Sequence, residues 1–185
     1  TYLTKLLDTE KNKHFIEPIG AVFKDYIAEV IDKEDFTKMN LLIRHSEMFL
    51  SHSNLLTDFV IAPIDGELGS VYRDLGKHEK AKQLFEQCIE IYRKNFYENH
   101  FWFAQALGRL GRVYSDQGNY PKAKQLLEQA ITIYRNNSYE NNPWFARTLG
   151  WLGNVYREQG DHKKAKQLFE ESLIIYKKNS YDNHP

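Results

Sequence analysis

A repeat of 42 residues constrains this sequence more than any other feature. Residues 101–142 and 143–184 are identical at 23 of their 42 positions, and residues 65–100 continue the pattern in the same register. A fixed spacing that recurs three times indicates an array of similar structural units stacked side by side. We therefore expect a repeat array and not a globule with one central core.

Each unit carries the pattern of two amphipathic helices joined by a short turn. In the middle unit, Leu107, Leu110 and Tyr114 follow one another at three- and four-residue spacing, which is the period of a helix. Gly118 predicts the end of this helix, and Pro121 predicts the first turn of the next one. Two such helices cannot bury both apolar faces alone, so each unit needs its neighbours.

The residues shared by the units resemble the tetratricopeptide repeat, whose pattern is Leu-x2-Leu-Gly-x2-Tyr followed by Ala-x3-Phe or Leu. The middle and last units carry the pattern at Leu107, Leu110, Gly111, Tyr114, Ala123 and Leu127, and at Leu149, Leu152, Gly153, Tyr156, Ala165 and Phe169. The first unit carries Leu68, Gly69, Tyr72, Ala81 and Phe85, with Asp65 at the leading apolar position. The 42-residue length is similar to the repeats of kinesin light chains. The resemblance implies an all-α, right-handed superhelix of stacked antiparallel helix pairs, a tetratricopeptide solenoid.

The repeat register divides the chain into four segments. We expect residues 59–100, 101–142 and 143–185 to be three repeats, and residues 1–58 to be a helical cap or a degenerate repeat. Helical stripes over residues 17–32 and 36–53 support that assignment, although the Leu-Gly-x2-Tyr signature is missing there. Because the chain starts without Met and ends in an expected loop, the array is expected to continue at both ends.

The composition disfavours several classes of protein. With 25 basic and 25 acidic residues the net charge is zero, whereas a dedicated nucleic-acid binder is usually basic. A single Cys, the lack of an apolar run of membrane-spanning length and the lack of a signal-peptide pattern favour a cytoplasmic protein. No phosphate-binding loop, strong zinc pattern or catalytic motif is present, so we expect neither an enzyme nor a cofactor or metal site. Cys88 aligns with Ala130 and Ser172, which predicts a buried, inert thiol.

Recognition in such arrays depends on positions that vary from one repeat to the next. Opposite the apolar stripe of each first helix lie polar residues and glycines, which the resemblance places in a concave groove that binds peptides. These residues are Ser70, Arg73 and Asp74 in the first unit, Gln105, Gly108, Arg112, Ser115 and Asp116 in the second, and Arg147, Gly150, Asn154, Arg157 and Glu158 in the third. Because arginine binds carboxylates through two parallel N–H donors, an acidic peptide is the expected ligand. The alternative is that these charges pair with one another and only keep the face soluble.

Tryptophan and glycine add two further expectations for this face. Trp102, Trp144 and Trp151 are candidate aromatic anchors, since tryptophan often carries binding energy at interfaces. The alternative is packing against a neighbouring helix, which we favour for Trp102 and Trp144. Gly108 and Gly150 lie mid-helix, which indicates close approach by either a ligand or a neighbouring helix.

These patterns predict a non-enzymatic protein–protein interaction module that binds a peptide or a partner protein in the concave groove. Two other roles stay open from the sequence. One is homotypic assembly through the exposed C-terminal repeat. The other is a sensor array that regulates a larger signalling NTPase. Neither nucleic acid nor a membrane is an expected partner.

Overall fold

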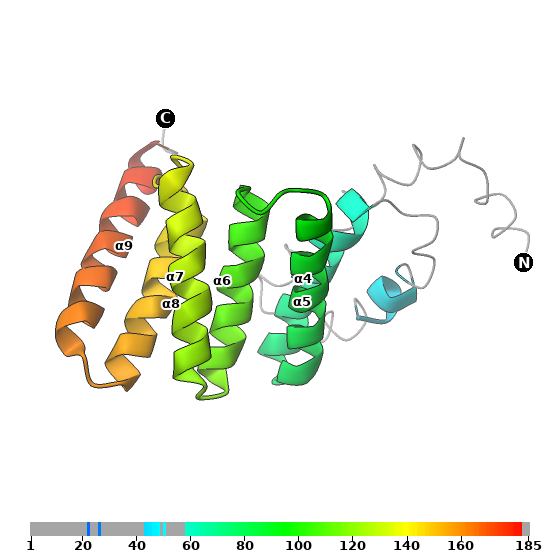
Figure 1. Ribbon diagram of the computed structural model, residues 1–185, viewed down its shortest axis with the longest axis horizontal. Helices are drawn as coiled ribbons and strands as arrows, with labels where there is room; N and C mark the ends of the chain where they lie inside the picture. The colour runs from blue at the N-terminus through cyan, green and yellow to red at the C-terminus, as the bar shows by residue number, and fades with distance from the viewer. Residues whose placement is uncertain (1–21, 23–25, 27–42, 49, 51–57, 183–185) are drawn as a thin grey trace, which may run out of the picture. The chain divides into compact units, whose positions relative to one another are not determined.

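The computed structural model describes residues 22, 26, 43–48, 50 and 58–182, with residues 59, 60 and 180–182 described by their backbone alone. Within these ranges the regular structure is helical throughout, as the sequence predicts, and no strand is present (Figure 1). The principal helices are α4 (Asp58–Asp74), α5 (His78–Lys94), α6 (Phe101–Asp116), α7 (Tyr120–Asn136), α8 (Pro143–Glu158) and α9 (His162–Asp182). Most of the stripes predicted over residues 17–32 and 36–53 lies outside the described residues.

The chain divides into two compact units, residues 1–91 and 92–185, and each is described by itself. The first unit contains α4 and most of α5. The second contains the end of α5 and the helices α6 to α9, of which α6 packs against α7, α7 against α8, and α8 against α9 (Figure 1). Each repeat of the second unit is thus a helix pair that is also packed on its neighbour, which is the arrangement that its apolar faces require.

Turns of one kind end the first helix of each pair. Gly76, Gly118 and Gly160 have φ angles of 71°, 76° and 82°, a left-handed conformation that glycine adopts without steric cost. In the middle repeat the side chain of Asn119 then accepts a hydrogen bond from the backbone N–H of Lys122 at 3.3 Å, which caps α7. Pro121 lies in the first turn of α7, as the sequence predicts.

The glycine of the repeat signature lets the two helices of a pair approach closely. A Cβ atom added there would lie less than 3 Å from the nearest side-chain atom of the paired helix. These distances are 2.9 Å from Gly69 to Phe85, 2.8 Å from Gly111 to Leu127 and 2.7 Å from Gly153 to Phe169. The signature therefore encodes a backbone-to-side-chain contact within each pair.

A small polar side chain on the second helix also bonds the backbone of the first helix in two of the pairs. The Cys88 thiol donates to the carbonyl of Ala62 at 3.1 Å, and the Ser172 hydroxyl donates to the carbonyl of Ala146 at 2.7 Å. Cys88 is buried, as its alignment with small residues predicts. Both side chains lie 26 residues after their acceptor, so the two helix pairs share an equivalent hydrogen bond from side chain to backbone.

Candidate functional site

The predicted groove residues of the second unit come from its two first helices, α6 and α8, which approach each other at Gly108. A Cβ atom on Gly108 would lie 3.1 Å from Oγ1 of Thr148 and 3.4 Å from Cζ3 of Trp151. The glycine therefore makes room for the neighbouring helix. At Gly150 the nearest atom is Oγ of Ser172, at an ordinary contact distance of 3.8 Å.

Two tryptophans of α8 stack with arginines of α6 and α8. The ring of Trp144 has the guanidinium of Arg109 at 4.6 Å and that of Arg147 at 4.4 Å from its centroid, and Arg112 lies 5.4 Å from the centroid of Trp151. The two tryptophan rings meet edge to face, with centroids 6.4 Å apart. We call these five residues the Trp–Arg cluster. A guanidinium on an aromatic ring contributes about 0.5 to 2 kcal/mol, so the cluster holds α8 against α6.

The members of the Trp–Arg cluster differ in exposure. Arg109 is only 4% exposed and belongs to the packing between the helices. Trp144, Trp151 and Arg112 are partly exposed, and Arg147 is exposed. Within the described part of the chain Arg147 forms no ion pair, and its guanidinium lies over the Trp144 ring. The cluster therefore presents an aromatic surface with a guanidinium at its edge.

The other predicted arginines pair with the carboxylate that follows each in sequence. Arg157 lies 2.9 Å from Glu158, and Arg73 pairs with Asp74. The Arg157–Glu158 pair is exposed, and such surface pairs contribute about 0 to 1 kcal/mol, so an incoming carboxylate can exchange with Glu158 at little cost. The Arg73 side chain is only 9% exposed and is less accessible to a ligand.

Two of the predicted groove positions offer no accessible polar group. Ser70 is buried, and its hydroxyl donates to the carbonyl of Gly66 at 3.2 Å, while Gly108 is buried by its neighbours. Ser70 belongs to the first unit with Arg73 and Asp74, whereas the other predicted groove residues belong to the second. Gln105, Ser115 and Asn154 are partly exposed, and Asp116 is exposed.

Trp102 lies outside the cluster, in the first turn of α6. It is 39% exposed, and its ring lies 4.6 Å from that of His100 and 6.4 Å from that of Tyr92, centroid to centroid. The Nδ1 atom of His100 accepts a hydrogen bond from the backbone N–H of Trp102 at 3.4 Å and caps the helix. This tryptophan packs on the connection that precedes it.

Arg109 and Asp65 have structural roles that the sequence alone does not indicate. Arg109 is not among the predicted groove residues, although it occupies in α6 the position of Trp151 in α8, which could have marked it as part of the same surface. In the sequence, Asp65 stands out only as a departure from the repeat signature. The structure buries it, and burial raises the pKa of its carboxyl group to about 7.

Two kinds of site are absent from the described residues. No group of three or more His, Cys, Asp or Glu side chains there is placed to hold a metal ion. None of the described helices has both the length and the apolar character needed to cross a bilayer.

Sequence comparison places most of the array in one family. Profiles of the tetratricopeptide repeat match residues 60–136 and 146–179, which together make up more than half of the chain. No curated protein matches the sequence.

Solved structures resemble the fold at low sequence identity. BtubC (BKLC) from P. vanneervenii superposes with a TM-score of 0.69 at 18% identity, over 95% of this chain and 71% of its own. A putative kinesin light chain with nearly identical TPR-like repeats from Podosopora anserina gives 0.60 at 21% identity, over 86% and 76%. MamA gives 0.59 at 20% identity, over 96% and 86%. These likenesses show the fold, a superhelical array of helix pairs.

Proposed function

This chain belongs to the tetratricopeptide repeat family, with repeats like those of kinesin light chains, and we propose that it binds an acidic peptide segment of a partner protein on the exposed face of α6 and α8. The family consists of protein–protein interaction scaffolds, so a protein partner is the class of ligand to expect. The chain needs no chemistry of its own for this role, because recognition depends on a preformed surface.

The observation that carries the proposal is the Trp–Arg cluster. Arg147 is exposed and forms no ion pair in the described part of the chain, and its guanidinium carbon lies 4.4 Å from the centroid of the Trp144 ring. An exposed guanidinium without an ion-pair partner is suited to binding a carboxylate through two hydrogen bonds. Trp144 and Trp151 beside it supply partly exposed aromatic area for the apolar part of a peptide.

The spacing of two polar side chains along α8 indicates which groups of such a peptide they would bind. Arg147 and Asn154 are seven residues apart, so they share one helix face and their Cα atoms lie about 10 Å apart. An extended peptide covers that distance in about three residues. We therefore expect a carboxylate at Arg147 and a backbone amide, about three residues along the peptide, at Asn154.

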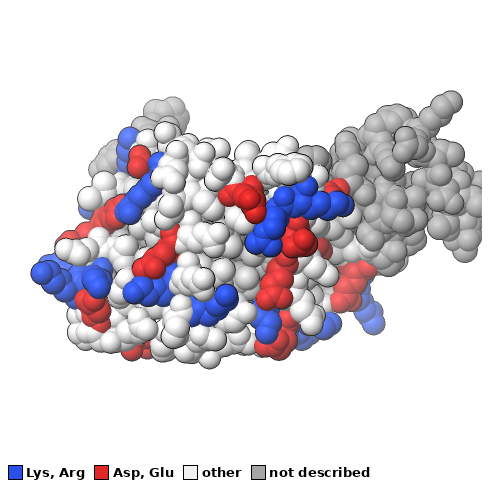
Figure 2. Space-filling model, in the orientation of Figure 1, with Lys and Arg blue, Asp and Glu red and all other residues white. Residues whose placement is uncertain are grey.

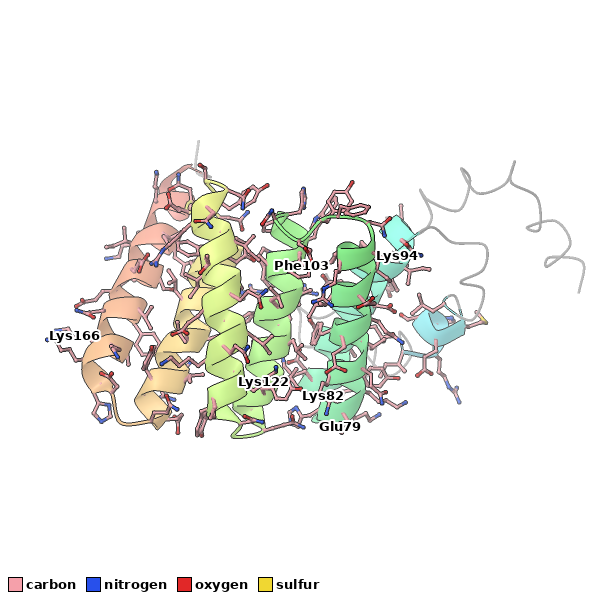
Figure 3. The ribbon with its side chains drawn as sticks, viewed as in Figure 1. Glu79, Lys82, Lys94, Phe103, Lys122 and Lys166 are labelled. Atoms are coloured by element: carbon pink, nitrogen blue, oxygen red, sulfur yellow. The ribbon has the colours of Figure 1, made fainter. Side chains whose placement is uncertain are left out.

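Selection from a random peptide library displayed on phage tests the proposal. The wild-type chain is compared with Arg112, Arg147 and Arg157→Glu, and both are checked for folding by circular dichroism. The matched control is Lys122, Lys163 and Lys166→Glu on the second helices α7 and α9, which makes the same change in net charge at exposed positions. Lys122 lies near the start of α7, and Lys166 projects outward from α9 (Figure 3).

The proposal expects the wild-type chain and the lysine control to select peptides rich in Asp and Glu, and the arginine variant to lose them. Recovery of the same acidic peptides with the arginine variant would contradict it. The lysine control tests whether net charge alone attracts the peptides. Positive and negative side chains are interspersed over the face shown in Figure 2, with no large area of one sign. Loss of binding in that control would indicate long-range attraction by net charge and not a site.

A second candidate function is self-association through α9, which one observation favours. Leu173 and Ile174 are 52% and 67% exposed, whereas Ile131, at the position of Leu173 in α7, is 6% exposed. Sedimentation velocity at a low and a high concentration tests this function. Self-association predicts a mass that rises with concentration in the wild type and stays monomeric in Leu173→Glu with Ile174→Glu. A constant monomeric mass in both would reject it.

A further inference from the structure

The first unit contains a pocket that is lined in part by a buried carboxyl group. It lies between α4, α5 and the residues Glu47 and Leu50, has a volume of about 630 Å³, and is lined by Asp65, Leu68, Tyr72 and other side chains. Its helices, α4 and α5, are not those of the Trp–Arg cluster, which lies on α6 and α8. Whatever occupies it is therefore a question separate from the peptide site on α6 and α8.

Asp65 is unusual for its position in the repeat. The equivalent residues of the other two repeats are Leu107 and Leu149, which are 3% and 0% exposed. Asp65 is 4% exposed, lines the pocket, and has no hydrogen bond or ion pair within the described part of the chain. Burial raises the pKa of this carboxyl group to about 7. A buried carboxylate without a partner costs free energy that a bound cation would offset.

The remaining lining suits a cation that has an apolar stem. Leu68 and Leu84 form apolar walls. The acidic side chains Glu47 and Glu90 outnumber the one basic group, Lys80, whose Nζ already lies 3.7 Å from Glu47 and 4.8 Å from the centroid of the Tyr72 ring. Lysine and arginine side chains place their methylene groups on apolar surface and their charge at a polar one.

We propose that this pocket binds a lysine or arginine side chain of a protein partner, with the alkyl stem between Leu68 and Leu84 and the charged group against Asp65. The pocket is thereby a second contact point, selective for positive charge, on a chain whose first-helix face is proposed to select negative charge. A partner that uses both would carry acidic and basic residues in separate segments.

The last repeat supplies an internal control for this proposal. A pocket of about 420 Å³ lies between α7, α8 and α9, and its lining repeats that of the first pocket at positions two repeat lengths further along. The repeated residues are Leu152, Tyr156, Lys164, Gln167 and Leu168, in place of Leu68, Tyr72, Lys80, Gln83 and Leu84. Here Leu149 stands where the first repeat has Asp65, so this pocket lacks the buried carboxyl group. It differs also in Arg135, which pairs with Glu171 at 2.9 Å in its lining.

The test uses n-butylammonium and n-butylguanidinium as probes and n-butanol as their uncharged counterpart. Each is titrated at pH 8 into the full 185-residue chain, and binding is followed by amide chemical shifts in NMR spectra. The variants are Asp65→Asn, which keeps the shape of the side chain, and Asp65→Leu, which restores the residue of the other repeats. Amides of Leu152 and Tyr156 report on the control pocket in the same sample.

We expect shifts at Asp65, Leu68 and Tyr72 that saturate roughly tenfold earlier for the cations than for butanol, the ratio that one hydrogen bond between charged groups typically gives. Both variants should abolish this preference, and the amides of the control pocket should show none. Bound cation should also lower the pKa of the Asp65 carboxyl group, measured by carbon NMR, since a positive charge favours the ionised form. Glu47, Tyr72, Lys80 and Glu90 also face the pocket, so their titration is followed alongside.

Three outcomes would overturn the proposal: equal affinity for the cations and butanol, a cation preference that survives in Asp65→Asn, or no binding of any probe near Asp65. None of these depends on the peptide selection described for α6 and α8, because the probes are not acidic and the variants leave the arginines of that face unchanged.

Discussion

The helix pairs α4–α5 and α8–α9 are built alike, but only the first has a carboxyl group at a buried position. Both place a signature glycine against a phenylalanine ring, both use a small polar side chain to bond an alanine carbonyl, and both stack a lysine on a tyrosine ring, at 4.8 Å and 5.0 Å. At the leading apolar position, however, one pair has Asp65 and the other Leu149. The contacts between backbones are thus repeated, while one side chain gives the first pair a chemical property that the last pair lacks.

The two pairs also differ in the exposure of the ring that contacts the signature glycine. Phe85 is completely buried, whereas its counterpart Phe169 is partly exposed. Within the second unit the same effect separates α7 from α9, since Tyr134 is 0% exposed and Tyr176, at the same repeat position, is 37% exposed. Helix α7 has α8 packed on it. Burial in such an array therefore depends on the next helix as much as on a residue's own sequence.

The largest effect is expected from removing the difference at Asp65. Because the folded pKa is raised to about 7, the unfolded chain loses the proton of Asp65 between about pH 4 and 7 while the folded chain keeps it. Wild-type stability should fall over that range and stay low above it. Asp65→Leu removes this loss, so its advantage in the free energy of unfolding should grow by about 2 to 4 kcal/mol from pH 4 to pH 8.

Urea denaturation at pH 4, 5.5 and 8 measures this advantage. The reciprocal change, Leu149→Asp, should destabilise the last pair, and more at pH 8 than at pH 4, for the same reason. An advantage of Asp65→Leu that is equal at pH 4 and pH 8 would mean that Asp65 ionises in the folded chain at its ordinary pKa.

A smaller effect should distinguish the two glycine contacts. The added Cβ atom of Gly69→Ala would press on the buried ring of Phe85, which has no room to move, and should cost about 2 kcal/mol. Gly153→Ala meets the partly exposed ring of Phe169, which can shift outward, and should cost under about 1 kcal/mol. The midpoints of urea denaturation give both values. Equal costs would show that the exposure of the ring does not decide the effect.

The smallest effect concerns the small polar side chains. Ser172→Ala removes the hydroxyl bond to Ala146 and should cost about 1 kcal/mol, the net contribution of one hydrogen bond. Cys88→Ala should cost less for the bond itself, because a thiol is a weak donor, although it also removes buried sulfur. Cys88→Ser is the matched change, since it gives the first pair the hydroxyl donor that the last pair has at Ser172. A loss above about 2 kcal/mol in Cys88→Ser would contradict the equivalence of the two contacts.

The repeat made the fold and its helix ends predictable from the sequence. Gly118 and Pro121 mark helix ends through their own backbone preferences, and comparison of the units shows the period and the small residue at Cys88. The Trp–Arg cluster was only partly predictable. Periodicity assigns a residue to a face of its helix, but which side chains of α6 and α8 meet depends on the distance between the helices, and that is set by Gly108 and Thr148. The role of Asp65 was not visible because a sequence does not show what surrounds a carboxyl group.

The positions of Cys88 and the tryptophans give the protein two independent spectroscopic reporters. All three tryptophans, Trp102, Trp144 and Trp151, belong to the second unit, and the single thiol belongs to the first, where it is 1% exposed. Tryptophan fluorescence therefore follows the melting of the second unit, while the rate at which a thiol reagent modifies Cys88 follows the opening of the first. Without any engineered label, one sample can show whether the array unfolds in a single step or unit by unit.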